Sequence, residues 1–185
     1  MTIGLLIRVL DVNQDISLDI ARILVLLRNY FSKYENEPIV GTTKVVKLDF
    51  LLRYPTILEE ALIMKKKTGK YLGIKDYERG LVESKMIRYR FGPWDDRYWS
   101  ILSTMESMKL LKIVKIDGVT NYMVTNEGMK IAEELETDPL YADYAKRSKT
   151  IVANFGYYTA TGIMKKVYEI RPELTKMKLG EEISP

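Results

Sequence analysis

The chain has no cysteine and no histidine among its 185 residues. Without cysteine it can form neither a disulfide nor a thiolate metal site, which fits a protein of the reducing cytoplasm. Without histidine it lacks the commonest general base and the commonest imidazole metal ligand. Ser-His-Asp and Cys-His nucleophile systems are therefore excluded. We expect no cofactor, no metal and no small-molecule substrate.

Long apolar runs and a strong charge imbalance are missing as well. No stretch approaches the roughly 18 apolar residues that a membrane span needs. The first ten residues lack the basic region and small-residue cleavage site of a signal peptide. The 29 basic residues only slightly exceed the 25 acidic ones, so contact with nucleic acid is permitted but not required. With 46% hydrophobic residues, we expect a soluble, cytoplasmic protein with a sizeable core.

One stretch, Ile87 to Gly128, organises the prediction of the fold. It opens with a short alternating run that breaks at Gly92-Pro93, and the apolar spacing then predicts a helix from about Asp95 to Met108. Two β-like runs follow, joined by Asp117-Gly118, a strong hairpin signal because both turn residues must adopt positive φ. Thr125 is placed to cap the next helix. This order predicts a winged helix.

The segments before this stretch are predicted to be mostly helical. Ile3 to Leu10 is expected to form a short strand or ordered arm, and Asp15 or Ser17 to cap a central helix that reaches Tyr34. A second helix begins near Thr42 or Thr43, either of which is a plausible cap. In this helix Asp49 and Arg53 are spaced to pair on an exposed edge. The fold class is thus mainly α with a small β-hairpin, a winged-helix domain embedded in additional helices.

Two units are expected along the chain. Residues 1–137 form a winged-helix-containing core domain, and residues 138–185 form a C-terminal helical extension packed on that core. The extension is predicted to contain helices at Leu140 to Phe155 and Gly162 to Ile170. The charged tail from Lys176 is expected to fray.

The remaining enzyme motifs are absent or better explained by local structure. No phosphate-binding GxxxxGK sequence occurs. Asp95-Asp96 is a carboxylate pair, but its place at a helix start is explained by capping and by the helix dipole. Glu83-Ser84-Lys85 lacks the partner acid that a Mg²⁺-dependent nuclease would need. We predict a protein that is not an enzyme.

Contact with DNA is a more serious hypothesis. In a winged helix, the segment Asp95 to Met108 would enter the major groove. Of its outward residues only Arg97 belongs to the types that usually read base edges. Basic residues gather elsewhere and are candidates for non-specific phosphate contacts. These candidates are Lys65, Lys66, Lys67, Lys70, Arg88, Arg90, Arg97, Lys112 and Lys115. An ordinary solvated surface explains them equally well.

Gly92-Pro93-Trp94 fixes an aromatic side chain at a helix entrance. The simpler interpretation is a buried anchor, a hydrophobic staple for the helix. The alternative is an aromatic hot spot for a partner protein, supported by Tyr98 and Trp99 nearby. Trp94, Tyr98 and Trp99 are therefore the candidate partner interface.

Two blocks of the sequence resemble a known family. Thr43 to Pro55 reads TKVVKLDFLLRYP, and Phe91 to Tyr98 reads FGPWDDRY. Both resemble blocks in the middle component of bacterial ABC-three-component, Lamassu-like defence systems. The segment from Thr161 to Glu173 is similar to the closing helix of those proteins, and the resemblance covers roughly Ile20 to Glu173.

The resemblance implies a non-enzymatic winged-helix subunit. Such a subunit assembles with an SMC-like ABC ATPase and an effector, often a nuclease, and helps to sense phage or plasmid DNA. It carries no catalytic residues over to this chain. The runner-up is a homodimeric winged-helix transcription regulator, because such regulators share the pattern Tyr122-x-Val124-Thr125-x-Glu127-Gly128.

Overall fold

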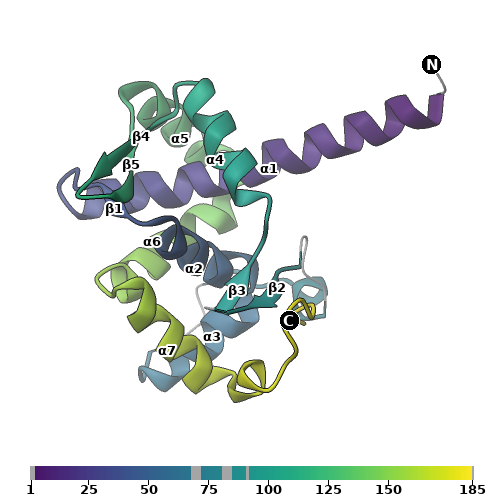
Figure 1. The fold of residues 1–185 in the computed structure, drawn as a ribbon, viewed down its shortest axis with the longest axis vertical. Helices are drawn as coiled ribbons and strands as arrows, with labels where there is room; N and C mark the ends of the chain where they lie inside the picture. The colour runs from purple at the N-terminus through teal and green to yellow at the C-terminus, as the bar shows by residue number, and fades with distance from the viewer. Residues whose placement is uncertain (1–2, 68–71, 81–84, 91, 185) are drawn as a thin grey trace.

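The fold is mainly α with a small β component. The computed structural model describes residues 3–67, 72–80, 85–90 and 92–184, with side chains described from residue 16 onward. Helix α1 (Ile3–Lys33) runs through the middle of the molecule, and its N-terminal half extends beyond the other elements (Figure 1). Val25 and Leu26 are fully buried, which confirms that this helix is packed on more than one side.

The predictions for the start of α1 are wrong. Residues 3–10 are helical and continue the central helix, so there is neither a strand nor a cap at Asp15 or Ser17. Asn13, Gln14 and Asp15 suggested a break because they are polar. However, this segment has no proline, and such residues reduce helix stability by only about 0.7 kcal/mol or less each.

Helix α2 (Thr42–Arg53) follows as predicted, and helix α3 (Pro55–Met64) comes directly after it, with Pro55 as its first residue. The expected threonine cap of α2 is wrong. Gly41, at φ 83°, occupies the cap position, and the Thr42 hydroxyl lies 2.6 Å from the Tyr122 hydroxyl instead. The helix is buried from Val45 to Arg53, so the predicted Asp49–Arg53 pair forms in the interior and not on an exposed edge.

The predicted hairpin is confirmed. β4 (Leu111–Ile116) and β5 (Val119–Val124) pair antiparallel, and β1 (Ile39–Val40) adds to the other side of β5. The turn residues Asp117 and Gly118 both have positive φ, 50° and 78°. The helices that flank the hairpin, α4 (Tyr98–Ser107) and α5 (Asn126–Thr137), lie beside it and against α1 (Figure 1).

Thr125 caps α5 as predicted. Its hydroxyl accepts a hydrogen bond from the Gly128 amide at 3.0 Å and donates one to the Lys109 carbonyl at 2.6 Å. We expect Thr125→Ala to lower the free energy of unfolding by about 1 kcal/mol, the usual loss for a removed threonine cap. Urea denaturation followed by circular dichroism measures this change, with Thr137→Ala at the other end of α5 as the control. A change below about 0.3 kcal/mol would mean that the cap contributes nothing.

A second small sheet corrects two further predictions. The chain does not break at Gly92-Pro93, because β3 (Gly92–Trp94) pairs antiparallel with β2 (Ile87–Tyr89). The tail is not frayed either. Its backbone bonds to the opposite side of β2, with the Ile183 amide donating to the Met86 carbonyl at 2.8 Å, and the Ile183 side chain is buried. Main-chain pairing of this kind leaves little trace in side-chain composition.

The C-terminal helices share the core of the first half of the chain. α6 (Ala142–Phe155) packs along α1, and α7 (Ala160–Ile170) packs on α2 and α3. The short helices η1 (Asp76–Arg79) and η2 (Pro172–Thr175) complete the described elements. The helices from residue 138 to residue 184 therefore pack on the preceding segment, and their buried apolar side chains belong to the same hydrophobic cluster.

Candidate functional site

The two sequence blocks singled out above meet in space. From α2, the Arg53 guanidinium donates to Asp49 at 2.9 Å and to Asp95, which precedes α4, at 2.8 Å. From the second block, Tyr98 donates its hydroxyl hydrogen bond to Asp49, and Arg97 bonds to Asp95 at 2.8 Å. Residues more than forty positions apart thus form one polar cluster at the start of α4.

Helix α1 contributes the other half of this cluster. Arg22 donates to Asp49 at 2.9 Å, and Asp19 lies 3.1 Å from the Arg97 guanidinium. Asp19, Arg22 and Asp49 are almost completely buried. We call the whole set the buried ion network; its members are Asp19, Arg22, Asp49, Arg53, Asp95 and Arg97.

The electrostatics of the network favour charged carboxylates. Burial by itself raises the pKa of Asp95, but hydrogen bonds from Arg97 and the charge of Arg53 outweigh it and lower that pKa to about 2. Burial also opposes ionisation of Asp49, and the charges of Arg22 and Arg53 hold its pKa below its ordinary value. Carboxylates whose oxygens already accept hydrogen bonds from arginines hold helices and loops together and are poorly suited to act as general bases.

Lys47 and Gly92 add a second link between the blocks. The Lys47 ammonium group is buried and donates to the Pro93 carbonyl at 2.7 Å. Gly92 has φ 101°, and a Cβ at this position would lie 1.8 Å from the Met164 sulfur. Only glycine fits here, so the turn into β3 and the direction of Trp94 are fixed by packing from α2 and α7.

Three aromatic side chains cover this region from outside. Trp94 lies with its ring centroid 6.0 Å from Tyr89 and 6.2 Å from Trp99, and its indole N–H donates to Asp96 at 2.8 Å. Trp99 is 56% exposed, Tyr89 is exposed and Trp94 is partly buried. We call Tyr89, Trp94 and Trp99 the aromatic patch.

The structure separates Tyr98 from the other two residues of the predicted partner interface. Trp94 and Trp99 belong to the aromatic patch, but the Tyr98 side chain is completely buried and cannot contact a partner. Tyr98 was included in the predicted interface because it lies near Trp94 in the sequence. Its hydroxyl instead bonds to Asp49, and burial raises its pKa above the ordinary value. Tyr89 was not singled out by the sequence, although its place on β2 opposite Gly92 positions it beside Trp94.

Asp19 and Arg22 are the functional residues that the sequence analysis missed. They lie three positions apart on the buried part of α1, among apolar neighbours. Two opposite charges at that spacing within an apolar helix are a detectable signal, because buried charges are normally paired.

The basic residues predicted to contact phosphate do not form one surface. Lys65, Lys66 and Lys67 follow the end of α3, whereas Lys112 and Lys115 lie on β4, at the other end of the molecule (Figure 1). Along an antiparallel strand, positions 112 and 115 also point to opposite faces of the sheet.

The other basic candidates have separate environments. Arg88 donates to the Leu174 carbonyl at 2.7 Å, and Arg97 belongs to the buried ion network with its side chain 39% exposed. Arg90 is exposed at the turn after β2. Lys70 lies outside the described residues.

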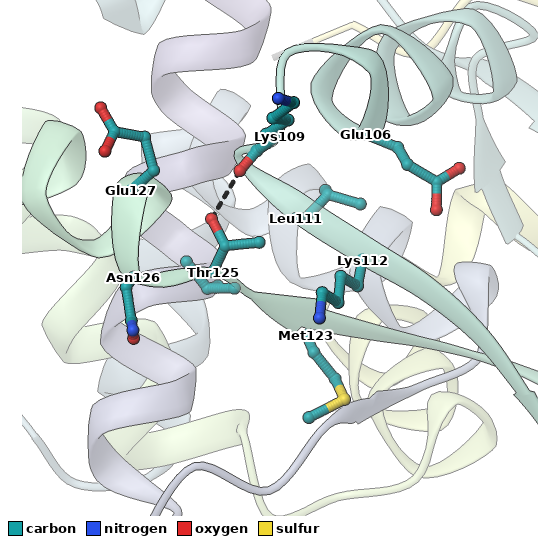
Figure 2. A pocket seen from close by; sticks show the side chains of 9 residues that line it. Glu106, Lys109, Leu111, Lys112, Met123, Thr125, Asn126 and Glu127 are labelled. Atoms are coloured by element: carbon teal, nitrogen blue, oxygen red, sulfur yellow. Dashed lines mark hydrogen bonds between the residues drawn. The ribbon is translucent and has the colours of Figure 1, made fainter.

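A shallow groove of about 680 Å³ lies beside the hairpin. Figure 2 shows Glu106 and Glu127 well apart, with Lys112 and Met123 below both of them in this view, while Lys109 points away from Lys112. Two carboxylates and two diverging lysines give no concentrated charge for an ionic ligand. Among the residues that the structure describes, no three acidic side chains converge as a metal site.

Comparisons with known proteins identify no relative. No protein-family model, curated protein or solved structure matches the chain. Within the described residues, no helix combines the length and apolar character that a membrane crossing requires.

Proposed function

We propose that this protein is a non-catalytic adaptor subunit of a cytoplasmic SMC-like ABC ATPase defence complex. In this proposal it links the ATPase to an effector, often a nuclease in such systems, and acts against phage or plasmid DNA. The observation that carries the adaptor role is the aromatic patch. The resemblance of Thr43 to Pro55 and of Phe91 to Tyr98 supplies the identity of the partners.

The aromatic patch has the properties of a protein-binding hot spot. Tryptophan and tyrosine dominate such spots because they bury a large area at a small cost in side-chain entropy. The Gly92 turn fixes the backbone direction at Trp94, and the hydrogen bond from the indole N–H to Asp96 fixes the orientation of the ring. A rigid aromatic surface of this kind loses little freedom when a partner covers it.

Helix α1 supplies a second argument. Its N-terminal half extends beyond the other elements (Figure 1), and the sequence from residue 3 to residue 15 is rich in leucine, isoleucine and valine. A helix with an apolar sequence is normally stabilised by packing against neighbours. An apolar helix that extends beyond the other elements is therefore suited to packing against a partner protein.

Under the same proposal, α4, β4, β5 and α5 form a winged-helix module that binds protein more than DNA. The solvent side of α4 carries Trp99, Ser100, Ser103 and Glu106, and its entrance carries Asp96. Base edges are read mainly by arginine, lysine, asparagine and glutamine, which this face lacks. Non-specific contact with DNA remains part of the proposal, through basic residues outside α4.

Co-expression with the two neighbouring genes tests the adaptor role. We expect a tag on this chain to recover a large ATPase in fixed stoichiometry at about 0.5 M salt, where DNA bridging through phosphates is weakened. Recovery of a lone homodimer that binds its own promoter DNA would contradict the proposal and support a transcription regulator.

Trp99→Ala tests the aromatic patch directly. A hot-spot residue contributes at least about 2 kcal/mol, so we expect the partner to bind roughly 30-fold more weakly. The measurement is titration of the purified ATPase onto the immobilised chain. Tyr77→Ala is the matched control, because Tyr77 is 67% exposed and lies outside the patch on η1. Equal affinity for the Trp99 variant and the wild type would exclude the patch as the interface.

A further inference from the structure

A second aromatic surface lies where the end of α3 meets the turn between α6 and α7. Lys65, Lys66 and Lys67 follow α3, and Tyr157 and Tyr158 lie in that turn. We call these five residues the tyrosine–lysine surface. It is formed by elements distinct from those of the aromatic patch, and Figure 1 places α3 and α7 away from the hairpin.

Two of its lysines are held in place by α6 and the turn that follows. The Lys65 ammonium group donates to the Asn154 carbonyl at 2.7 Å and to the Tyr157 hydroxyl at 3.1 Å, and Lys67 donates to the Asn154 side chain at 2.6 Å. The Lys65 nitrogen also lies 4.9 to 5.3 Å from the ring centroids of Phe155, Tyr157 and Tyr158. The positive charges are therefore fixed in position before any ligand binds.

The two tyrosines form a tilted aromatic pair that solvent can reach. Their ring centroids are 4.2 Å apart, and Tyr157 is 57% exposed. A hydrogen bond with Tyr158, a second with Lys65, and the charges of Lys65 and Lys67 lower the pKa of Tyr157. The hydroxyl end of the ring thus lies in a positive environment suited to an anion.

The adjoining cavity indicates which kind of ligand fits. It has a volume of about 140 Å³, and its walls are mostly apolar, with the Lys166–Glu169 ion pair at the rim. Pockets that enclose small molecules usually have about 300 Å³ or more. An enclosed mononucleotide therefore does not fit, whereas an extended chain lying on the open surface does.

We propose that the tyrosine–lysine surface binds single-stranded nucleic acid, with phosphates at the lysines and an unpaired base stacked on Tyr157. Single-strand sites combine positive charge that follows the backbone with aromatic rings that receive bases. A duplex keeps its base faces stacked inside and cannot use such a ring. This inference uses no residue of the aromatic patch, and it deepens the non-specific DNA contact of the proposed function by naming single strands as the ligand.

Fluorescence anisotropy of the full-length chain with a labelled oligo(dT) of roughly 15 nucleotides tests the proposal. We expect Tyr157→Ala to bind about 5-fold to 150-fold more weakly, the range for loss of one stacked base. Lys66, which is exposed, is the position at which we test the contribution of positive charge to binding. In Lys66→Gln, the slope of log affinity against log salt between about 50 and 200 mM should fall by about 0.7.

Controls separate this site from the others. Tyr77→Ala, Lys112→Gln and Trp99→Ala should all bind the oligonucleotide like the wild type. Several results would overturn the proposal: no binding by the wild type at about 100 µM protein and 50 mM salt, wild-type affinity in Tyr157→Ala, or displacement by an equal concentration of a mononucleotide. A preference for duplex DNA that Tyr157→Ala leaves unchanged would also overturn it.

The two proposals can fail separately. Loss of ATPase recovery in Trp99→Ala with intact oligonucleotide binding supports the adaptor role alone. Intact recovery in Tyr157→Ala with weakened oligonucleotide binding supports the nucleic-acid site.

Discussion

Asp49→Asn is expected to destabilise the protein by about 3 to 5 kcal/mol, the range measured when one partner of a buried ion pair is removed. The Asp49 side chain is inaccessible to solvent and accepts hydrogen bonds from Arg22, Arg53 and Tyr98. An asparagine of the same size loses the negative charge and turns an amide donor toward groups that also donate. Two arginines would then remain buried without their shared carboxylate.

Denaturant unfolding followed by circular dichroism measures this loss, and the midpoint should fall without a change in slope. Glu133→Gln is the matched control, because it makes the same chemical change in an exposed ion pair with Arg28. Such exposed pairs contribute about 0 to 1 kcal/mol. Similar stability losses in the two variants would show that the buried ion network contributes no more than a surface pair.

Stability is expected to rise by up to about 4 kcal/mol between pH 7 and pH 10, because of Lys47. Burial, together with the charge of Arg88, lowers the pKa of Lys47 to about 7, whereas an unfolded lysine titrates near pH 10.4. Between these values the unfolded chain binds the extra proton, so raising the pH favours the folded state. Below about pH 7 Lys47 is protonated in both the folded and the unfolded chain, so its titration no longer changes stability.

Two buried tyrosines set the upper limit of the pH range over which stability rises. Burial raises the pKa of Tyr98, and it raises the pKa of Tyr54 to about 12. Above about pH 10 these side chains ionise in the unfolded state first, which favours unfolding. We therefore expect maximum stability near pH 10.

Urea denaturation at a series of pH values checks this dependence. Lys47→Met should remove the rise between pH 7 and pH 10, and Lys130→Met, at an exposed position on α5, should keep it. A wild-type profile that is flat over this interval, or a rise that persists in Lys47→Met, would show that Lys47 is not the group responsible.

Local signals in the sequence predicted the local parts of the fold. Asp117-Gly118 fixes its turn through positive φ, and Thr125 caps α5 through a hydrogen bond three residues away. Each of these effects depends on residues within one turn of chain. The same signals could not locate the start of α1, because Asn13 to Asp15 are compatible with a helix as well as with a loop.

The candidate site was only partly predictable, because its charges are paired over long distances. Asp49 and Arg53 were correctly expected to interact, but their burial depends on Asp19, Arg22 and Asp95, which lie on other elements. Spacing on one helix cannot show that three elements meet. Trp94 and Trp99 were found because aromatic residues beside Gly92-Pro93 stand out. Tyr98 is instead spaced at helical intervals from Ile101 and Met105, and this spacing is the sequence signal of its burial.

The buried ion network also has a consequence for how related sequences can differ. A buried charge cannot be replaced without changing its partner, because the single change leaves the other charge without compensation. Positions 19, 22, 49, 53 and 95 should therefore covary among homologues, changing together or not at all. We therefore expect the two blocks, although separate in the sequence, to change together during evolution.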